Sequence, residues 1–284
     1  MTNIDDLLDW IGNGGEPLAD ACLIQDIKAA LGVAELLPDR RSFFRIEASF
    51  ALRGSLLIDS GGLHDYQGPD KVHVSAKQQA DDSNKPVLPG TSLAGALRSR
   101  ARRIAAVIGG RERADCLIKD MFGPEMDSRG TESRNAQEAS RVLVNETVIE
   151  NARADLVQNR VSIDRFTGGA RETALFNEQP VFGSDDTMLT VDIKLLKPQE
   201  REIGLILLLL KDLWTGDLPL GGGTGIGRGR LKGLKAVLTR RQGDGSQQEW
   251  IIERSGQGLK IDGEREVLEE FVNSLSVSLK GACS

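Results

Sequence analysis

The stretch with the most conspicuous chemistry is LPLGGGTGIGRGRLKG, residues 218–233, which combines seven glycines with three basic residues. Two known nucleotide-binding motifs are rich in glycine, but neither fits. No Lys-Ser or Lys-Thr pair follows the glycines, and no glycine begins a G-x-G-x-x-G spacing. Glycine lets another backbone approach closely, and arginine pairs well with phosphate. The run therefore indicates either close contact with phosphates or a flexible turn between two elements.

A second set of candidates lies in the loop over residues 59–90, which carries five aspartates and both histidines of the chain. They are Asp59, Asp65, Asp70, Asp81, Asp82, His64 and His73. Histidine can act as a general acid or base near neutral pH. An isolated aspartate on a loop is more often a solvated charge or a turn former. With two histidines in all, a histidine-rich metal site is excluded.

The charge of the chain is unevenly distributed. The net charge of −6 speaks against bulk non-specific binding of nucleic acid. Residues 90–113 nevertheless contain six arginines and one acid, and residues 227–241 contain basic residues and no acid. Salt limits each patch to a local field of about 8–10 Å, so an acidic chain can still carry a basic groove. Two solvated basic surfaces are the alternative.

The apolar runs, the N-terminus and the cysteines limit the class of protein to which the chain can belong. The longest strongly apolar run, residues 203–210, is far shorter than the roughly 20 residues of a membrane span, so no membrane partner is expected. The N-terminus starts acidic and lacks the apolar segment of a secretory signal. The three cysteines, Cys22, Cys116 and Cys283, are widely separated, which favours a reducing, cytoplasmic location.

The hydrophobic pattern predicts an α+β fold. Strands with alternating apolar residues are expected at 43–53, 141–150, 187–196 and 229–240, and helices at 91–108 and 198–214. Thr91 or Ser92 is expected to cap the first helix. The order β-α-β-β-α-β is that of the ferredoxin-like, RNA-recognition-like fold.

The connectors divide the chain further. Residues 54–90, 109–140 and 151–186 are long for a compact domain, which usually means function or disorder. Residues 1–40 lie outside the ferredoxin-like pattern, and two short helices are expected there. The predicted organisation is an N-terminal helical appendage over 1–40 and one ferredoxin-like domain with insertions over 41–284. The appendage is expected either to dock on a neighbour or to pack on the domain's own sheet.

Four segments together resemble the RAMP superfamily of CRISPR-associated proteins. They are SFALRGSLLIDSGG (49–62), VLPGTSLAGALRSRARRI (87–104), VSIDRFTGGARETALFNEQPVF (161–182) and EIGLILLLLKDLWTGDLPLGGGTGIGRGRLKG (202–233). Within that superfamily, the chain is most similar to the backbone subunit of type III effector complexes. The resemblance covers roughly residues 43–240.

The resemblance implies a ferredoxin-like core that stacks along a CRISPR guide RNA, with an inserted β-hairpin thumb that reaches over the RNA. The expected partners are guide RNA, complementary target RNA, other effector subunits, and copies of this chain or related RAMP subunits. Base pairing would read the target, so the protein holds the guide mainly through its backbone.

The resemblance and the residue chemistry together give the expected RNA-binding residues. In the glycine run they are Gly221, Gly222, Gly223, Gly225, Gly227, Arg228 and Arg230. At the first helix they are Ser92, with its helix N-terminus, and the i, i+4 pair Arg98 and Arg102, although an ordinary amphipathic helix with solvated arginines is the alternative. In the thumb region they are Arg165, Phe166, Gly168 and Gly169, where Phe166 is expected either to stack on a base or to be a packed loop residue.

The resemblance also implies metal-dependent cutting of target RNA by an aspartate in the loop after the first strand. That aspartate is expected near residue 74, so Asp70 is the nearest acid and the first candidate, with Asp65 and His73 behind it. A carboxylate suits Mg²⁺, which would be the cofactor of an active subunit. A subunit that has lost the nuclease is the alternative. A stand-alone RAMP endoribonuclease that processes repeat transcripts is a second function, and a small-molecule enzyme is a third, for which no pocket motif is present.

Overall fold

The computed structural model describes most of the chain after residue 40. The described residues are 41–61, 68–77, 83–124, 139–256 and 258–281. The predicted helical appendage over 1–40 lies outside them.

A six-stranded antiparallel sheet forms the centre of the described chain, in the order β14-β13-β12-β1-β11-β6. Its strands are β1 (Phe43–Arg53), β6 (Val142–Val144), β11 (Met188–Leu196), β12 (Arg230–Arg241), β13 (Gln247–Ser255) and β14 (Gly258–Asp262). The helices are α3 (Gly90–Gly109), α4 (Arg111–Phe122), α5 (Glu200–Thr215) and α6 (Arg265–Lys280). Strands β12, β1, β11 and β6, with α3 and α5 between them in the chain, have the ferredoxin-like order 4-1-3-2, which confirms the predicted fold.

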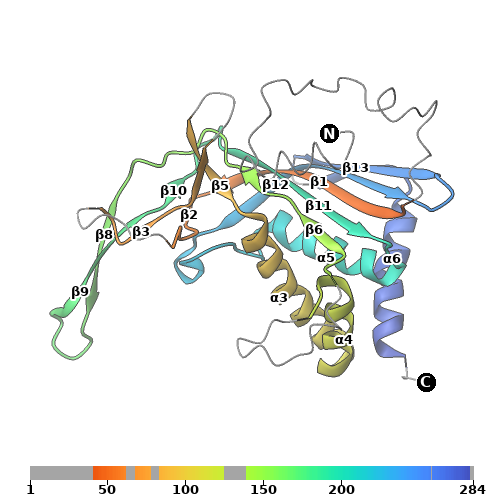
Figure 1. Cartoon of the computed structure of the whole chain (residues 1–284), viewed down its shortest axis with the longest axis horizontal. Coiled ribbons are helices and arrows are strands. Elements are labelled where there is room, and N and C mark those ends of the chain that lie inside the picture. Colours follow the sequence, from red (N-terminus) through yellow and green to blue (C-terminus); the bar gives the residue numbers. More distant parts are fainter. Residues whose placement is uncertain (1–40, 62–67, 78–82, 125–138, 257, 282–284) are drawn as a thin grey trace, which may run out of the picture. The chain divides into compact units, whose positions relative to one another are not determined.

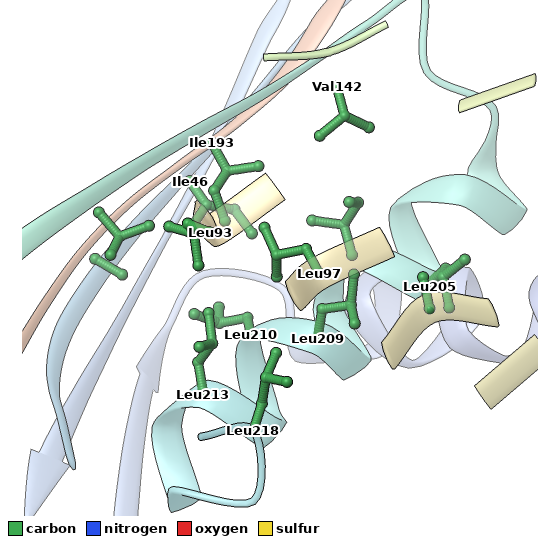
Figure 2. Packing of buried hydrophobic residues seen from close by; sticks show 14 of the residues in the cluster. Ile46, Leu93, Leu97, Val142, Ile193, Leu205, Leu209, Leu210, Leu213 and Leu218 are labelled. Carbon is green, nitrogen blue, oxygen red and sulfur yellow. The ribbon is translucent and has the colours of Figure 1, made fainter. Parts of the chain in front are cut away.

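The sheet buries one face because its strands alternate. In β1, the side chains of Phe44, Ile46, Ala48 and Phe50 are buried, whereas the residues between them are partly or fully exposed. Figure 2 shows Ile46 and Ile193 of the sheet meeting leucines of α3 and α5. This contact between the sheet and the helices forms the hydrophobic core, and the loops described below extend from it.

Helix α5 carries the apolar run over residues 203–210 into the core. Its start is fixed by a capping box, in which Gln199 and Glu202 exchange hydrogen bonds between side chain and backbone. Glu202 is fully buried and forms an ion pair with Arg141, which precedes β6. The pair ties the start of the helix to the edge of the sheet.

Two local predictions were wrong. The strand predicted over 141–150 is split into β6 and the two-residue β7 (Thr147–Val148). Between them, Asn145 donates its backbone N–H to Asp192 O and its Nδ2–H to the Asp192 carboxylate. Helix α3 starts at Gly90 with Pro89 as its N-cap, and no side chain caps it. A Cβ at Gly90 would lie 2.3 Å from the carbonyl oxygen of Val144, so a glycine is needed where the helix starts against β6.

The long connectors fold into short strands and a hairpin. Strands β8 (Gln158–Ile163) and β9 (Ala170–Gln179) form an antiparallel hairpin inside the predicted connector 151–186, and β9 also pairs with β3 (Lys71–Val72) in parallel. The remaining strands are β2 (Ser55–Leu56), β4 (Ser75–Lys77), β5 (Asn84–Leu88) and β10 (Val181–Phe182), and a 3₁₀ turn, η2, spans Thr224–Ile226. Figure 1 shows the hairpin running out from the central sheet, away from α4 and α6. The inserted hairpin is therefore present.

None of the helices in the described part of the chain is both long enough and apolar enough to cross a membrane.

Candidate nucleic-acid interface

The glycine run forms an exposed loop between α5 and β12 with a fixed base, which we call the glycine loop (residues 218–230). Gly222 donates its N–H to Leu57 O at 2.7 Å, and Gly229 donates to Ser55 O at 2.7 Å. Leu220 donates to Gly229 O at 2.9 Å and closes the loop. These bonds anchor the loop on the chain that leaves β1, so it is not a freely flexible turn.

Two glycines of this loop are required by its fold. Gly221 has φ +72°, and a Cβ there would lie 2.3 Å from Leu57 O. Gly229 has φ +76°, and a Cβ there would lie 1.8 Å from Leu220 O. Side chains rarely adopt this backbone conformation, and neither site has room for one. Close approach to backbone was expected from the sequence, but at these two positions the approaching backbone is the protein's own.

The tip of the loop is open. Gly223, Gly225 and Gly227 are exposed, and a Cβ on Gly225 or Gly227 would meet nothing within 4 Å. Within the described residues, the N–H groups of Gly221 and Gly223 make no hydrogen bond. Exposed backbone N–H groups in a turn with positive φ values suit an anion such as phosphate. The tip therefore has the properties expected of a phosphate contact.

The two arginines of the loop differ from each other. Arg228 is 3% exposed; its Nη1 lies 2.9 Å from Glu178 Oε2, and its Nη2 donates to Gln158 Oε1 at 2.7 Å. Arg228 was predicted to bind RNA, whereas in the structure its guanidinium contacts Glu178 and Gln158 at the base of the hairpin. Arg230 is exposed and donates one N–H to Gly216 O at 2.8 Å. Of the pair, Arg230 is the one that faces solvent.

The turn of the hairpin presents the predicted thumb residues. Asp164 Oδ1 accepts hydrogen bonds from the N–H groups of Thr167, at 3.0 Å, and Phe166, at 2.7 Å, and these bonds lower the pKa of the Asp164 carboxyl. Gly168 has φ +68° and lets the chain reverse. Phe166 is fully exposed, so it is not a packed loop residue within the described chain. Arg165 and Gly169 are exposed beside it.

The cutting candidates have different surroundings. Asp70 is exposed, and its Oδ2 accepts the N–H of Asn177 at 2.7 Å, so the carboxylate is held at the base of the hairpin. Asp65 lies outside the described residues. Among the described residues, no group of three His, Cys, Asp or Glu side chains is placed to hold a metal ion.

His73 is a buried structural residue. Its Nδ1 accepts the N–H of Ile58 at 3.1 Å, so Nε2 carries the proton and donates to Val87 O at 3.0 Å. Burial lowers the pKa of the ring. Both ring nitrogens are occupied by backbone, so the structure disagrees with a general acid or base role for His73.

The arginines of α3 hold α4. Arg98 donates to Gly123 O at 2.8 Å, at the end of α4, and Arg102 lies 2.9 Å from Asp115 on the same helix. The two arginines were predicted to bind RNA, because α4, which supplies their partners, was not predicted. Ser92 lies half-buried in the first turn of α3 and makes no capping bond. The N-terminus of α3 remains a candidate contact, whereas the two arginines pair with the protein.

Candidate site residues that are far apart in the sequence lie close together at the base of the hairpin. The segment Leu57–Ile58 contacts the glycine loop through Leu57 O and His73 through Ile58 N–H. Residues Asn177 and Glu178 of β9 contact Asp70 and Arg228. Gln158 and Glu178 were not predicted as site residues, because the alternation of a strand does not show which distant arginine a side chain will contact.

The fold and this cluster of loops define a ferredoxin-like protein with an inserted hairpin beside an exposed glycine loop. A family model described as the RAMP superfamily matches residues 10–232, well over half of the chain. The chain therefore belongs to the RAMP superfamily, and with it to the RNA-binding, CRISPR-associated proteins. No curated protein matches the sequence.

Proposed function

We propose that the chain is the guide-RNA-binding backbone subunit of a type III CRISPR effector complex, acting in antiviral defence in the cytoplasm. The observation that carries the proposal is the placement of the open glycine loop beside the base of a projecting hairpin, on a RAMP fold. Phosphates of the guide would bind at the loop tip and Arg230, and the exposed Phe166 would contact bases. The partners would be guide and target RNA, other effector subunits, and copies of this chain or related RAMP subunits.

Cutting of target RNA is the second half of the proposal. Mg²⁺ commonly binds through one or two carboxylates together with substrate phosphates, so a single held carboxylate such as Asp70 fits it when RNA is bound. The ion would stabilise negative charge on the phosphate that is attacked. Asn177 contributes by orienting the Asp70 side chain through its N–H.

The RNA that co-purifies with the full-length protein tests this proposal. Expressed with its neighbouring genes and a repeat array, the protein should carry guides that share a repeat-derived tag and differ in spacer. Sequencing that RNA shows whether it carries such guides. Cleavage of repeat transcripts by the purified chain alone, without the other subunits, would support the stand-alone processing enzyme and overturn the backbone-subunit proposal.

A further inference from the structure

A polar cluster with a buried ion pair at its centre connects the glycine loop to the hairpin, and the proposed function does not use it. Glu178 of β9 lies at its centre, with its Oε2 at 2.9 Å from Arg228 Nη1 and at 2.9 Å from Arg160 Nε. Gln158 of β8 accepts from Arg228 at 2.7 Å and from Arg160 at 3.3 Å. Glu178 and Arg228 are 7% and 3% exposed. We call these four residues the hinge cluster.

The hinge cluster joins two segments of the chain, the hairpin and the glycine loop, through their side chains. Gln158, Arg160 and Glu178 belong to the strands of the hairpin, whereas Arg228 belongs to the glycine loop. A buried charge that loses its partner is strongly destabilised, so the cluster favours one relative placement of hairpin and loop. An exposed ion pair would constrain that placement far less.

The same stretch of β9 also contacts the segment that carries Asp70. Asn177 donates to Asp70, and Gln179 O accepts the N–H of His73 at 3.0 Å. Glu178, which lies between them, is bound to Arg228. A change in the angle of the hairpin would therefore move the Asp70 carboxylate and the glycine loop relative to each other.

We infer that Glu178, Arg228 and Gln158 are positioning residues that hold the hairpin at a fixed angle and distance from the glycine loop. Arg228 then acts on RNA through the placement of two surfaces, and a direct bond to phosphate would require breaking its ion pair with Glu178. The inference rests on the proposed function for its RNA consequences. Its structural half concerns the protein alone and is measured without RNA.

The structural half is tested by a distance measurement in the full-length protein. Spin labels are placed on Cys116 of α4, which is exposed, and on Arg171→Cys in the hairpin, with Cys22 and Cys283 replaced by serine. Glu178→Gln, Arg228→Ala and their combination should each broaden the distance distribution. The double variant should broaden it no further than the single variants, because the partners act as one unit.

Glu253→Gln is the matched control. It makes the same chemical change in an exposed ion pair, 2.8 Å from Lys235, and should leave the distance distribution unchanged. Glu178→Gln is nearly isosteric, so it keeps the test valid if Arg228→Ala fails to fold. A distribution in Glu178→Gln as narrow as in the parent protein would overturn the inference.

The RNA half is tested by guide affinity at several salt concentrations. Glu178→Gln should weaken binding about tenfold, which corresponds to about 1.4 kcal/mol of lost preorganisation, and leave the salt dependence unchanged. A reduced salt dependence in Arg228→Ala with an unchanged distance distribution would show a direct phosphate contact and overturn the inference. Absence of guide binding in the parent protein would instead contradict the proposed function, while the distance measurement still decides the structural half.

Discussion

Arg230 and Arg228 show how two residues of one type, two positions apart, come to have different roles. Both lie in the glycine loop, and the sequence offers no feature that distinguishes their roles. The structure buries Arg228 against Glu178 and leaves Arg230 at the surface. Arginine pairs with either carboxylate or phosphate, so the neighbours that the fold supplies decide which one it meets.

Arg230→Ala should reduce the salt dependence of guide binding. Loss of one phosphate contact lowers the slope of log K against log salt concentration by about 0.7 for a single strand. The affinity for unrelated guide sequences should fall equally, since a phosphate contact carries no sequence information. Filter binding of two unrelated guides at four salt concentrations measures both. A loss confined to one guide would contradict the assignment.

His73 should make stability depend on pH. Burial lowers its pKa from 6.5, so the folded state binds the proton less readily than the unfolded state. The stabilising contribution is complete above about pH 6.5 and is lost as the pH falls toward the lower folded-state value. Denaturant unfolding should show that the free energy of unfolding decreases as the pH is lowered from 7.5 to 5.5.

The matched variant for this test is His73→Gln, which should be less stable at pH 7.5 but show a weaker dependence on pH over this range. Its two backbone partners, Ile58 N–H and Val87 O, lose the imidazole in that variant. An equally steep dependence in His73→Gln would assign the effect to other groups.

At the scale of elements, the glycine loop is a rigid base with an open tip. The base is held by hydrogen bonds to Ser55 and Leu57, and the tip is exposed. Motifs of this kind need glycine for two separate reasons, namely backbone conformation at the base and access at the tip. The two reasons can be separated by experiment.

Gly229→Ala and Gly225→Ala separate them. At Gly229 an added methyl group meets Leu220 O and the backbone is left-handed, so unfolding should become easier by at least about 1–2 kcal/mol. At Gly225 the added methyl group meets nothing within 4 Å, so stability should stay within about 0.5 kcal/mol of the parent. Guide affinity should still fall in Gly225→Ala, because the methyl group lies at the tip. Equal stability of the two variants would contradict the structural role of Gly229.

At the scale of the whole molecule, a cut would need guide, target, metal and Asp70 together. In the assembled complex, Asp70→Ala should abolish the Mg²⁺-dependent cut attributable to this subunit and leave guide and target binding near normal. Asp65→Ala should leave the cut unchanged, and the Phe166→Ala variant should bind target less well through lost base contact. Gel analysis of labelled target with Mg²⁺ or with chelator measures the cut.

Two outcomes of that experiment would change the assignment. A parent complex that binds target without any Mg²⁺-dependent cut would leave the chain as a scaffold. Cutting that survives Asp70→Ala but disappears in Asp65→Ala would move the active carboxylate to Asp65. Assembly is checked by size-exclusion chromatography in each case, because a loss of assembly would imitate a loss of catalysis.

The order and type of the core elements follow from the amino-acid sequence alone. Alternation in β1, β11 and β12 and the apolar faces of α3 and α5 are local patterns, because burial on one face repeats with the period of the element. The hairpin region was located through the resemblance to the RAMP superfamily, and the glycine loop from its own run of glycines and arginines. Helices α4 and α6 and strands β13 and β14 were not predicted.

The partners of the charged and polar side chains, by contrast, depend on the folded structure. Arg228 pairs with Glu178, Arg98 and Arg102 turn to α4, and His73 binds backbone on both sides. These contacts join residues distant in the chain, and no periodicity records them. A charged group gains most from whichever opposite charge or carbonyl the folded chain brings within about 3 Å, and that neighbour exists only once the sheet and helices have assembled.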